Sequence, residues 1–303
     1  MKRSDTVIVF GGSGFLGSHV ADALSDTGFD VRIFDLVPSP YLRSDQTMIV
    51  GSILDAALVR EATAGCKVVY NFAALADIDD AADKPATTLT TNVVGMINTL
   101  EAAREFCARR FVFASSVYVF SVQGGLYRAS KQAAELFIEA YQARFGLPFT
   151  ILRYGSLYGR RANQNNTIHR MVREALTTGT ITYYGSDQAQ REYIHVSDAA
   201  RMSVKILSPE FENRHVVLTG QEHMLIRDVM QMIATISGRE VGLSVLPTAS
   251  DSHYVHTPYS FRPQVGHKLV SNDFVDMGQG LLDCMAEIHE TLPPADTELP
   301  EPI

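Results

Sequence analysis

The sequence has 303 residues, of which 46% are hydrophobic and 20% charged, and this composition excludes an intrinsically disordered chain. A formal net charge of −8 disfavours a general nucleic-acid or anionic-membrane binder. No apolar stretch approaches the length of a transmembrane helix. The 3 cysteines fit a reducing compartment, and the histidines lack the spacing of a metal site. We therefore expect a cytoplasmic protein without a bound metal, and neither nucleic acid nor membrane among its partners.

Short β-branched segments alternate with longer amphipathic segments through the first half of the chain. The predicted strands are Thr6–Phe10, Val31–Asp35, Met48–Gly51, Val68–Ala73, Arg110–Ser116 and Thr150–Tyr154. The predicted helices between them are Leu16–Thr27, Ala56–Ala64, Asn92–Arg109 and Ala129–Phe145. Continuous apolar strands separated by helices are typical of a parallel sheet that is covered on both faces. The pattern predicts an α/β fold with a Rossmann-type doubly wound parallel sheet.

A glycine-rich turn joins the first predicted strand to the first predicted helix. Gly11, Gly14 and Gly17 are spaced for a tight turn in which backbone N–H groups and the helix N-terminus face a pyrophosphate. Because the turn directly follows a buried strand, we predict a dinucleotide site rather than an ordinary glycine-rich loop.

An aspartate ends the second predicted strand. Asp35 follows Gly17 by 18 residues, where a carboxylate accepts hydrogen bonds from the adenosine ribose and repels a 2′-phosphate. No arginine follows at position 36 or 37 to bind that phosphate. We therefore predict NAD rather than NADP as the cofactor, with an acidic strand-end cap as the alternative interpretation.

A tyrosine and a lysine, Tyr127 and Lys131, lie four positions apart near the start of a predicted helix, so both project from one face. The pKa of a free tyrosine is about 10, and a nearby ammonium group favours the phenolate. Ser115 and Ser116 end the preceding predicted strand, at the edge where parallel sheets place their ligands. We predict that Tyr127, Lys131 and one of these two serines are catalytic residues of a site that oxidises a substrate hydroxyl.

The pattern changes after about residue 160, where a polar segment precedes shorter and more mixed elements. We predict that residues 1–160 form the NAD-binding domain and that residues 161–303 form mainly a smaller, mixed substrate-binding domain. A strand near residues 215–220 is expected to return to the main sheet. From about residue 292, prolines and acidic residues predict a disordered tail.

With these residues the chain resembles the extended short-chain dehydrogenase/reductases, in particular the nucleotide-sugar epimerase/dehydratase group. The resemblance covers roughly residues 5–290. It rests on the glycine turn, Asn71–Ala74, Asn92–Gly95, Ser115–Val119, the Tyr127/Lys131 pair, Leu152–Gly159 and Arg191–Asp198.

The resemblance implies roles for individual residues. Tyr127 is expected to act as acid and base, Lys131 to bind the nicotinamide ribose, and Ser116 to be the hydroxyl partner. The implied cofactor-binding residues are Gly11, Ser13, Gly14, Phe15, Leu16, Gly17, Asp35, Ser52, Ile53, Phe72, Ala73, Ala74, Asn92, Tyr127, Lys131 and Tyr154. The implied substrate is a nucleotide-diphosphate sugar, bound by Ser116, Asn166, Tyr184, Arg191 and Arg262, with the two arginines on the pyrophosphate. For His195 we expect a structural role.

The chain also departs from the pattern of the family. Val117 and Tyr118 replace the Asp-Glu pair that sugar 4,6-dehydratases place after their threonine, so dehydration lacks its acid and base. The loop at residues 117–126 is short for an extended member, so it offers few contacts to a sugar. We expect the polar segment Ser252–Arg262 to close over the ligand instead, with an ordinary surface loop as the alternative.

These features favour an NAD-dependent nucleotide-sugar epimerase, acting at C4. A net nucleotide-sugar dehydrogenase or 4-ketoreductase with the same residues is the alternative, and a non-catalytic NAD-sensing protein is a third hypothesis. By resemblance we also expect a homodimer that pairs the helices near residues 92–109 and 129–145. Leu100, Phe137 and Tyr141 are the apolar residues expected to contribute to that interface.

Overall fold

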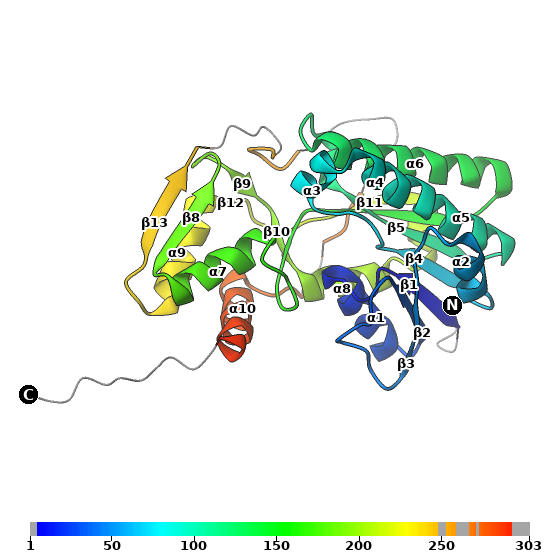
Figure 1. Cartoon of the computed structure of the whole chain (residues 1–303), viewed down its shortest axis with the longest axis horizontal. Coiled ribbons are helices and arrows are strands. Elements are labelled where there is room, and N and C mark those ends of the chain that lie inside the picture. The colour runs from blue at the N-terminus through cyan, green and yellow to red at the C-terminus, as the bar shows by residue number, and fades with distance from the viewer. Residues whose placement is uncertain (1–4, 248–252, 259–266, 271–272, 293–303) are drawn as a thin grey trace, which may run out of the picture.

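The computed structural model describes residues 5–247, 253–258, 267–270 and 273–292. These residues form a larger lobe built around a sheet and a smaller lobe of short strands and helices (Figure 1). None of the helices in these ranges is both long and apolar enough to cross a membrane. Nor do these ranges contain a group of three or more His, Cys, Asp or Glu side chains that could hold a metal ion.

An eight-stranded sheet, in the order β14-β11-β6-β5-β4-β1-β2-β3, forms the centre of the larger lobe. Its strands are β1 (Thr6–Phe10), β2 (Asp30–Asp35), β3 (Gln46–Val50), β4 (Val68–Asn71), β5 (Arg110–Ser116), β6 (Phe149–Tyr154), β11 (Arg214–Leu218) and β14 (His267–Lys268). Every neighbouring pair is parallel. The predicted Rossmann-type doubly wound sheet is confirmed, and β1 and β5 have the predicted bounds.

Helices cover both faces of this sheet and bury one hydrophobic core on each. On one face lie α1 (Phe15–Asp26) and α8 (Val196–Lys205), and on the other lie α2 (Ala56–Thr63), α5 (Met96–Glu105) and α6 (Gly125–Phe145). Leu100 of α5 is fully buried in the second core. The expectation that Leu100 contributes to a dimer interface is therefore wrong, because the helix uses this side chain to pack on its own sheet.

Shorter elements connect these layers. After β4 come α3 (Ile78–Asp83), α4 (Pro85–Leu89) and one turn of π-helix, η1 (Thr90–Gly95). After β5 comes a 3₁₀ turn, η2 (Val117–Phe120), and a second one, η3 (Pro209–Phe211), precedes β11.

The smaller lobe has its own hydrophobic core, formed by α7 (Thr167–Thr177), α9 (Ile226–Ser237) and α10 (Met277–Thr291) together with short strands. These strands pair as β8 (Thr180–Tyr184) with β13 (Gly242–Leu246), β9 (Gln190–Arg191) with β12 (Met224–Leu225), and β7 (Ser156–Tyr158) with β10 (Tyr193–His195).

The chain passes between the two lobes several times. It leaves the sheet after β6 to form β7, α7 and β8, returns to it for α8 and β11, and leaves again for α9. It then adds β14 to the sheet edge, and the last helix that the structure describes, α10, lies in the smaller lobe. Residues after 160 therefore supply α8 and β14 to the larger lobe, in addition to β11. Arg161 links the lobes, since its backbone N–H donates to Glu287 of α10 (2.9 Å) and its side chain pairs with Asp22 of α1 (2.7 Å).

Candidate active site

The turn between β1 and α1 is tight enough that two of its glycines admit no side chain. Gly11 has φ +80°, and a Cβ there would lie 2.5 Å from the backbone nitrogen of Ala73, beyond the end of β4. A Cβ at Gly17 would lie 2.1 Å from the carbonyl oxygen of Gly11. Gly14 caps α1 without a side-chain hydrogen bond, so the first N–H groups of the helix are left for a ligand. This backbone cradle fits the pyrophosphate of a dinucleotide.

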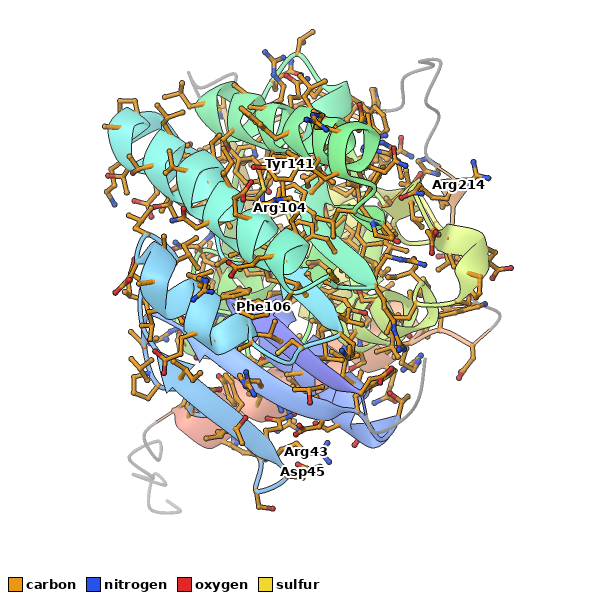
Figure 2. The ribbon with its side chains drawn as sticks, turned by 90° about the vertical axis from the view of Figure 1, so that its right-hand side faces the viewer. Arg43, Asp45, Arg104, Phe106, Tyr141 and Arg214 are labelled. Atoms are coloured by element: carbon orange, nitrogen blue, oxygen red, sulfur yellow. The ribbon has the colours of Figure 1, made fainter. Side chains whose placement is uncertain are left out.

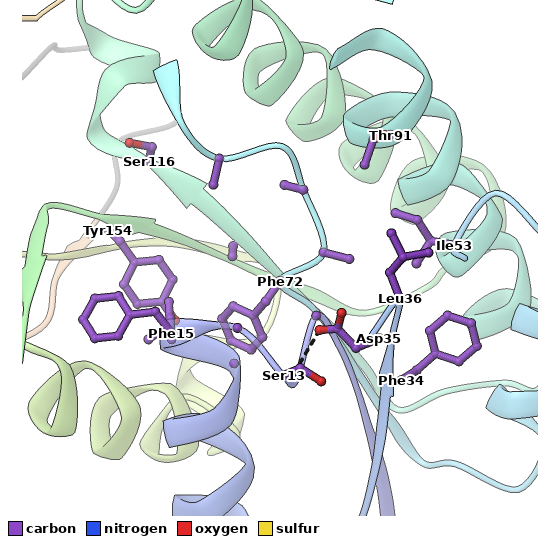
Figure 3. A pocket seen from close by; sticks show the side chains of 18 of the residues that line it. Ser13, Phe15, Phe34, Asp35, Leu36, Ile53, Phe72, Thr91, Ser116 and Tyr154 are labelled. Atoms are coloured by element: carbon purple, nitrogen blue, oxygen red, sulfur yellow. Dashed lines mark hydrogen bonds between the residues drawn. The ribbon is translucent and has the colours of Figure 1, made fainter. Parts of the chain in front are cut away.

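The carboxylate of Asp35 is held against this turn. Its Oδ2 accepts a hydrogen bond from the backbone N–H of Ser13 (2.9 Å), and the Ser13 hydroxyl donates to the carbonyl of Val37 (2.8 Å; Figure 3). The end of β2 and the glycine turn are thus joined, and Asp35 lines the cavity beside them. A carboxylate at this point fits a ribose better than a ribose 2′-phosphate.

A cavity of about 760 Å³ runs along the carboxyl ends of the strands. Asp35, Leu36 and Ile53 lie toward one side of it, and Phe15, Tyr154 and Ser116 toward the other (Figure 3). The predicted cofactor-binding residues that line it are Gly11, Ser13, Gly14, Phe15, Leu16, Gly17, Asp35, Ser52, Ile53, Phe72, Ala73, Ala74, Tyr127, Lys131 and Tyr154. Leu36, Val37 and Leu54 also line it and were not predicted from the sequence. For Leu36 and Val37, their position directly after the strand-end Asp35 is a usable signal.

Asn92 is the predicted cofactor residue that does not line this cavity. Its side chain is buried in η1, where it accepts a hydrogen bond from the N–H of Leu75 (2.7 Å) and donates to the Leu75 carbonyl and the Ser130 hydroxyl (both 3.0 Å). Asn92 therefore holds the loop after β4 against helix α6, which carries Tyr127 and Lys131. A single π-turn in a helix is frequently found beside a functional site.

Tyr127 and Lys131 are buried on one face of α6, next to the end of β5. The Lys131 Nζ donates to the carbonyl of Ala114 (2.7 Å) and lies 5.7 Å from the centre of the Tyr127 ring. Burial raises the pKa of Tyr127 to about 12, and a hydrogen bond with Ser116 opposes this shift. Burial lowers the pKa of Lys131 to about 8, opposed by the charge of Glu135. Both groups are thus desolvated, and an added positive charge nearby would favour the tyrosinate.

The two serines at the end of β5 have different surroundings. The Ser115 hydroxyl donates to the buried carboxylate of Glu135 (2.5 Å), which is also paired with Arg153 (2.6 Å). Ser116 instead has its hydroxyl beside Tyr127 and accepts a hydrogen bond from the N–H of Tyr118 (3.3 Å). Of the two serines, Ser116 is therefore the one whose hydroxyl lies next to Tyr127.

A second cavity of about 520 Å³ adjoins the first at Leu157 and Asn166. Tyr184 and Arg191 also line it. The Asn166 side chain caps α7 and donates to the carbonyl of Leu157 (2.8 Å), so its carboxamide is already fixed by the fold. Arg191 stacks on Tyr254 (4.3 Å to the ring centre), and its Nη1 donates to the carbonyl of Val255 (3.0 Å). Arg262 lies outside the described residues.

His195 caps helix α8, where its Nδ1 accepts a hydrogen bond from the N–H of Ser197 (3.3 Å). Burial lowers its pKa below the usual range, so the ring is neutral at neutral pH. Both observations fit the structural role expected for it.

The fold and the glycine turn define a dinucleotide-binding protein of the Rossmann class with a polar cavity next to its reactive side chains. The model of the NAD dependent epimerase/dehydratase family matches residues 7–219, and the chain belongs to this family. The predicted resemblance and the predicted cofactor NAD are confirmed by this match.

Individual relatives cover most of the chain. The "Uncharacterized UDP-glucose epimerase YtcB" of Bacillus subtilis is 26% identical over 78% of this chain and 84% of its own. A UDP-N-acetyl-alpha-D-glucosaminuronate decarboxylase of Bacillus cytotoxicus is 28% identical over 83% of each chain. The crystal structure of the UDP-glucose 4-epimerase of Thermotoga maritima with UDP-glucose superposes with a TM-score of 0.81 at 21% identity, covering 95% of this chain and all of the other. At 21% identity, this structural similarity shows that the two proteins share a fold.

Proposed function

We propose that this protein is an NAD-dependent nucleotide-sugar epimerase that inverts C4 of the sugar. The observation that carries the proposal is that Ser116 and Tyr127 line the cofactor cavity, which a second, substrate-sized cavity adjoins at Leu157 and Asn166. Relatives named as UDP-glucose epimerases, which match this chain along most of its length, support the choice of substrate class.

The reactive residues have separable tasks. Tyr127 takes the proton of the sugar hydroxyl and later returns it, while the Ser116 hydroxyl donates a hydrogen bond to the same oxygen. Lys131 places a positive charge next to the Tyr127 ring and favours its ionised form. When bound in the glycine-turn cavity, NAD would supply the hydride acceptor and donor that epimerisation needs. Position 118 holds a tyrosine instead of a carboxylate, which supports epimerisation over dehydration.

The substrate cavity supplies the groups that a nucleotide diphosphate requires. Arg191 is fixed by its stack on Tyr254, while its Nε and Nη2 atoms carry further N–H donors for a phosphate. Tyr184 is more than half exposed and offers a ring face near Arg191 for a base. We include Asn166 and Arg262 in the proposed binding set.

The test uses purified protein with NAD and UDP-glucose, UDP-galactose or UDP-N-acetylglucosamine. We expect interconversion of C4 epimers, followed by NMR, with no net change of absorbance at about 340 nm. Tyr127→Phe should bind the same ligands and turn them over at least about 100-fold more slowly. Stoichiometric formation of NADH would instead identify a net dehydrogenase.

We also propose that the protein is a homodimer and that it works in the cytoplasm. Phe137, Leu136 and Phe145 of α6 are 43%, 66% and 49% exposed, which supports an interface on the outer side of this helix. Tyr141 is half-buried and donates to Glu101 of α5, so it bridges the two helices (Figure 2). Cys66, Cys107 and Cys284 are free thiols, which supports a reducing compartment.

A further inference from the structure

Tyr118 joins the reactive residues to the segment 253–258, which lies 135 residues later in the chain. Its ring meets the Tyr127 ring edge-on, with 6.2 Å between centres, and packs on Tyr254 at 4.7 Å. Its hydroxyl lies 2.7 Å from Nδ1 of His253. The turn before α6 makes room for this ring, because a Cβ on Gly124, whose φ is +90°, would lie 2.6 Å from the Tyr118 Cδ1. Tyr118 and His253 together line the substrate cavity next to Tyr127.

Among the residues that the structure describes, the Asp and Arg side chains lining this cavity divide by lobe. Asp77 and Asp79, at the start of α3, belong to the larger lobe, which also carries Ser116 and Tyr127 (Figure 1). Arg170 of α7 and Arg191 of β9 belong to the smaller lobe. By charge complementarity the diphosphate binds on the arginine side, so the sugar lies on the side of the acids and of Tyr127.

Tyr118 and His253, which line the same cavity, are both uncharged at neutral pH. Desolvation lowers the pKa of His253 and outweighs the opposing charges of Asp79 and Asp77, while Arg191 adds to the lowering. Burial raises the pKa of Tyr118 well above its usual value. The phenol and the imidazole can therefore exchange hydrogen bonds with hydroxyl or amide groups, but they offer no positive charge to a carboxylate.

We propose that Tyr118 and His253, together with Asp77 and Asp79, are specificity-determining residues that select a sugar without negative charge. The sugar is then a neutral hexose or an N-acylated amino sugar, and a hexuronate is rejected. The inference rests on the proposed function and narrows its substrate. The reason is electrostatic, because a sugar carboxylate placed here would meet two aspartates in a partly desolvated cavity.

The test measures dissociation constants by calorimetry for UDP, UDP-glucose and UDP-glucuronate on the NAD-loaded protein. We expect UDP-glucose to bind at least about tenfold more tightly than UDP-glucuronate. Equal or tighter binding of UDP-glucuronate would overturn the inference and leave the proposed function intact. If UDP itself and both sugars fail to bind, the proposed function is overturned, and the inference with it.

Charge-removing variants attribute the selectivity to these residues. Asp77 caps α3 by accepting from the N–H groups of Asp79 and Asp80, and asparagine keeps that cap while removing the charge. The double variant Asp77→Asn/Asp79→Asn should therefore fold and bind UDP-glucuronate several-fold more tightly. Asp83→Asn, an exposed acid at the end of the same helix, is the matched control and should change nothing. Unchanged discrimination in the double variant would refute the assignment.

A second variant tests the aromatic part of the proposal. Tyr118→Phe keeps the ring contacts with Tyr127 and Tyr254 but removes the hydroxyl that meets His253. We expect unchanged binding of UDP and a several-fold loss of the extra affinity that the glucose moiety provides. Tyr41→Phe, outside the substrate cavity, is the control. Equal sugar-dependent affinity in Tyr118→Phe and wild type would remove Tyr118 from the proposed set.

Discussion

Lys131 is a buried cation whose ammonium donates a hydrogen bond to a backbone carbonyl. Lys131 is 4% exposed. Its ammonium donates to the carbonyl of Ala114, and its Nζ lies 4.8 Å from the centre of the Phe113 ring. The lowering of its pKa from 10.5 to about 8 means that the folded protein is less stable with this lysine charged. A residue proposed for catalysis thus weakens the fold that holds it.

Lys131→Met should stabilise the cofactor-free protein by up to about 3 kcal/mol near pH 7, while abolishing turnover. The sign follows from proton binding: between about pH 8 and 10.5 the unfolded chain holds the Lys131 proton and the folded chain does not. Wild-type stability therefore gains from this group as pH rises through that window, and the advantage of the variant shrinks there. Urea unfolding at several pH values measures both effects. A variant less stable than wild type at pH 7 would contradict the argument.

We propose that the cofactor preference depends on Asp35 and the two apolar residues after it. Asp35→Ala combined with Leu36→Arg should shift the ratio of NADPH to NADH affinity by about tenfold or more toward NADPH, because a repelling carboxylate is replaced by a phosphate-binding guanidinium. Asp35→Asn, which keeps an acceptor for the Ser13 N–H, should show a smaller shift. Fluorescence titration with NADH and with NADPH measures both affinities in the wild-type protein and in each variant. A wild-type protein that prefers NADPH would be incompatible with NAD as its cofactor.

At the scale of elements, the turn between β1 and α1 is the most constrained segment of the site. Gly17→Ala would force a Cβ within 2.1 Å of the Gly11 carbonyl oxygen, so the turn must open. We expect NAD affinity to fall at least about tenfold, with UDP binding much less affected, since the substrate cavity is built mainly from other elements. Gly242→Ala is the control, because its Cβ would come no closer than 3.3 Å to Thr180. Calorimetry measures the affinity of each variant for NAD and for UDP. Unchanged NAD affinity in Gly17→Ala would contradict the binding of the NAD pyrophosphate by this turn.

Elements with strong local signals could be predicted from the sequence, and those fixed by distant contacts could not. β1 and β5 are runs of mostly buried residues, and their bounds were predicted correctly. The helix predicted at 92–109 instead begins with the π-turn η1 and ends at Glu105. Asn92 within this π-turn bonds to Leu75 and Ser130, which lie 17 and 38 residues away, and no local pattern reveals such contacts.

The same limit applies to the candidate site. Gly11, Asp35, Tyr127 and Lys131 carry recognisable spacings, and all of them line one cavity. Tyr118 stands beside Ser116 in the sequence, yet its position in the site depends on His253 and Tyr254, which only the folded chain brings to it.

At the scale of the whole molecule, the outer side of α6 predicts the state of assembly. We expect a homodimer at micromolar concentration, and Leu136→Asp should weaken it at least about tenfold, because a charge would enter an apolar contact. Leu243→Asp, at a comparably apolar but distant exposed site, should leave the dimer intact. Sedimentation velocity distinguishes the species. A wild-type monomer at micromolar concentration would contradict the proposal.

The repeated passage of the chain between the two lobes has a thermodynamic consequence. The elements α8, β11 and β14 of the larger lobe alternate along the chain with elements of the smaller lobe. Unfolding of either lobe should therefore disturb the segments that connect it to the other. The contacts of Arg161 with Glu287 and Asp22 add to this coupling. Heat should therefore unfold the chain in a single calorimetric transition, and NAD, although held by one lobe, should raise the melting temperature of both. Two separate transitions, with only one moved by NAD, would mean that the lobes unfold independently.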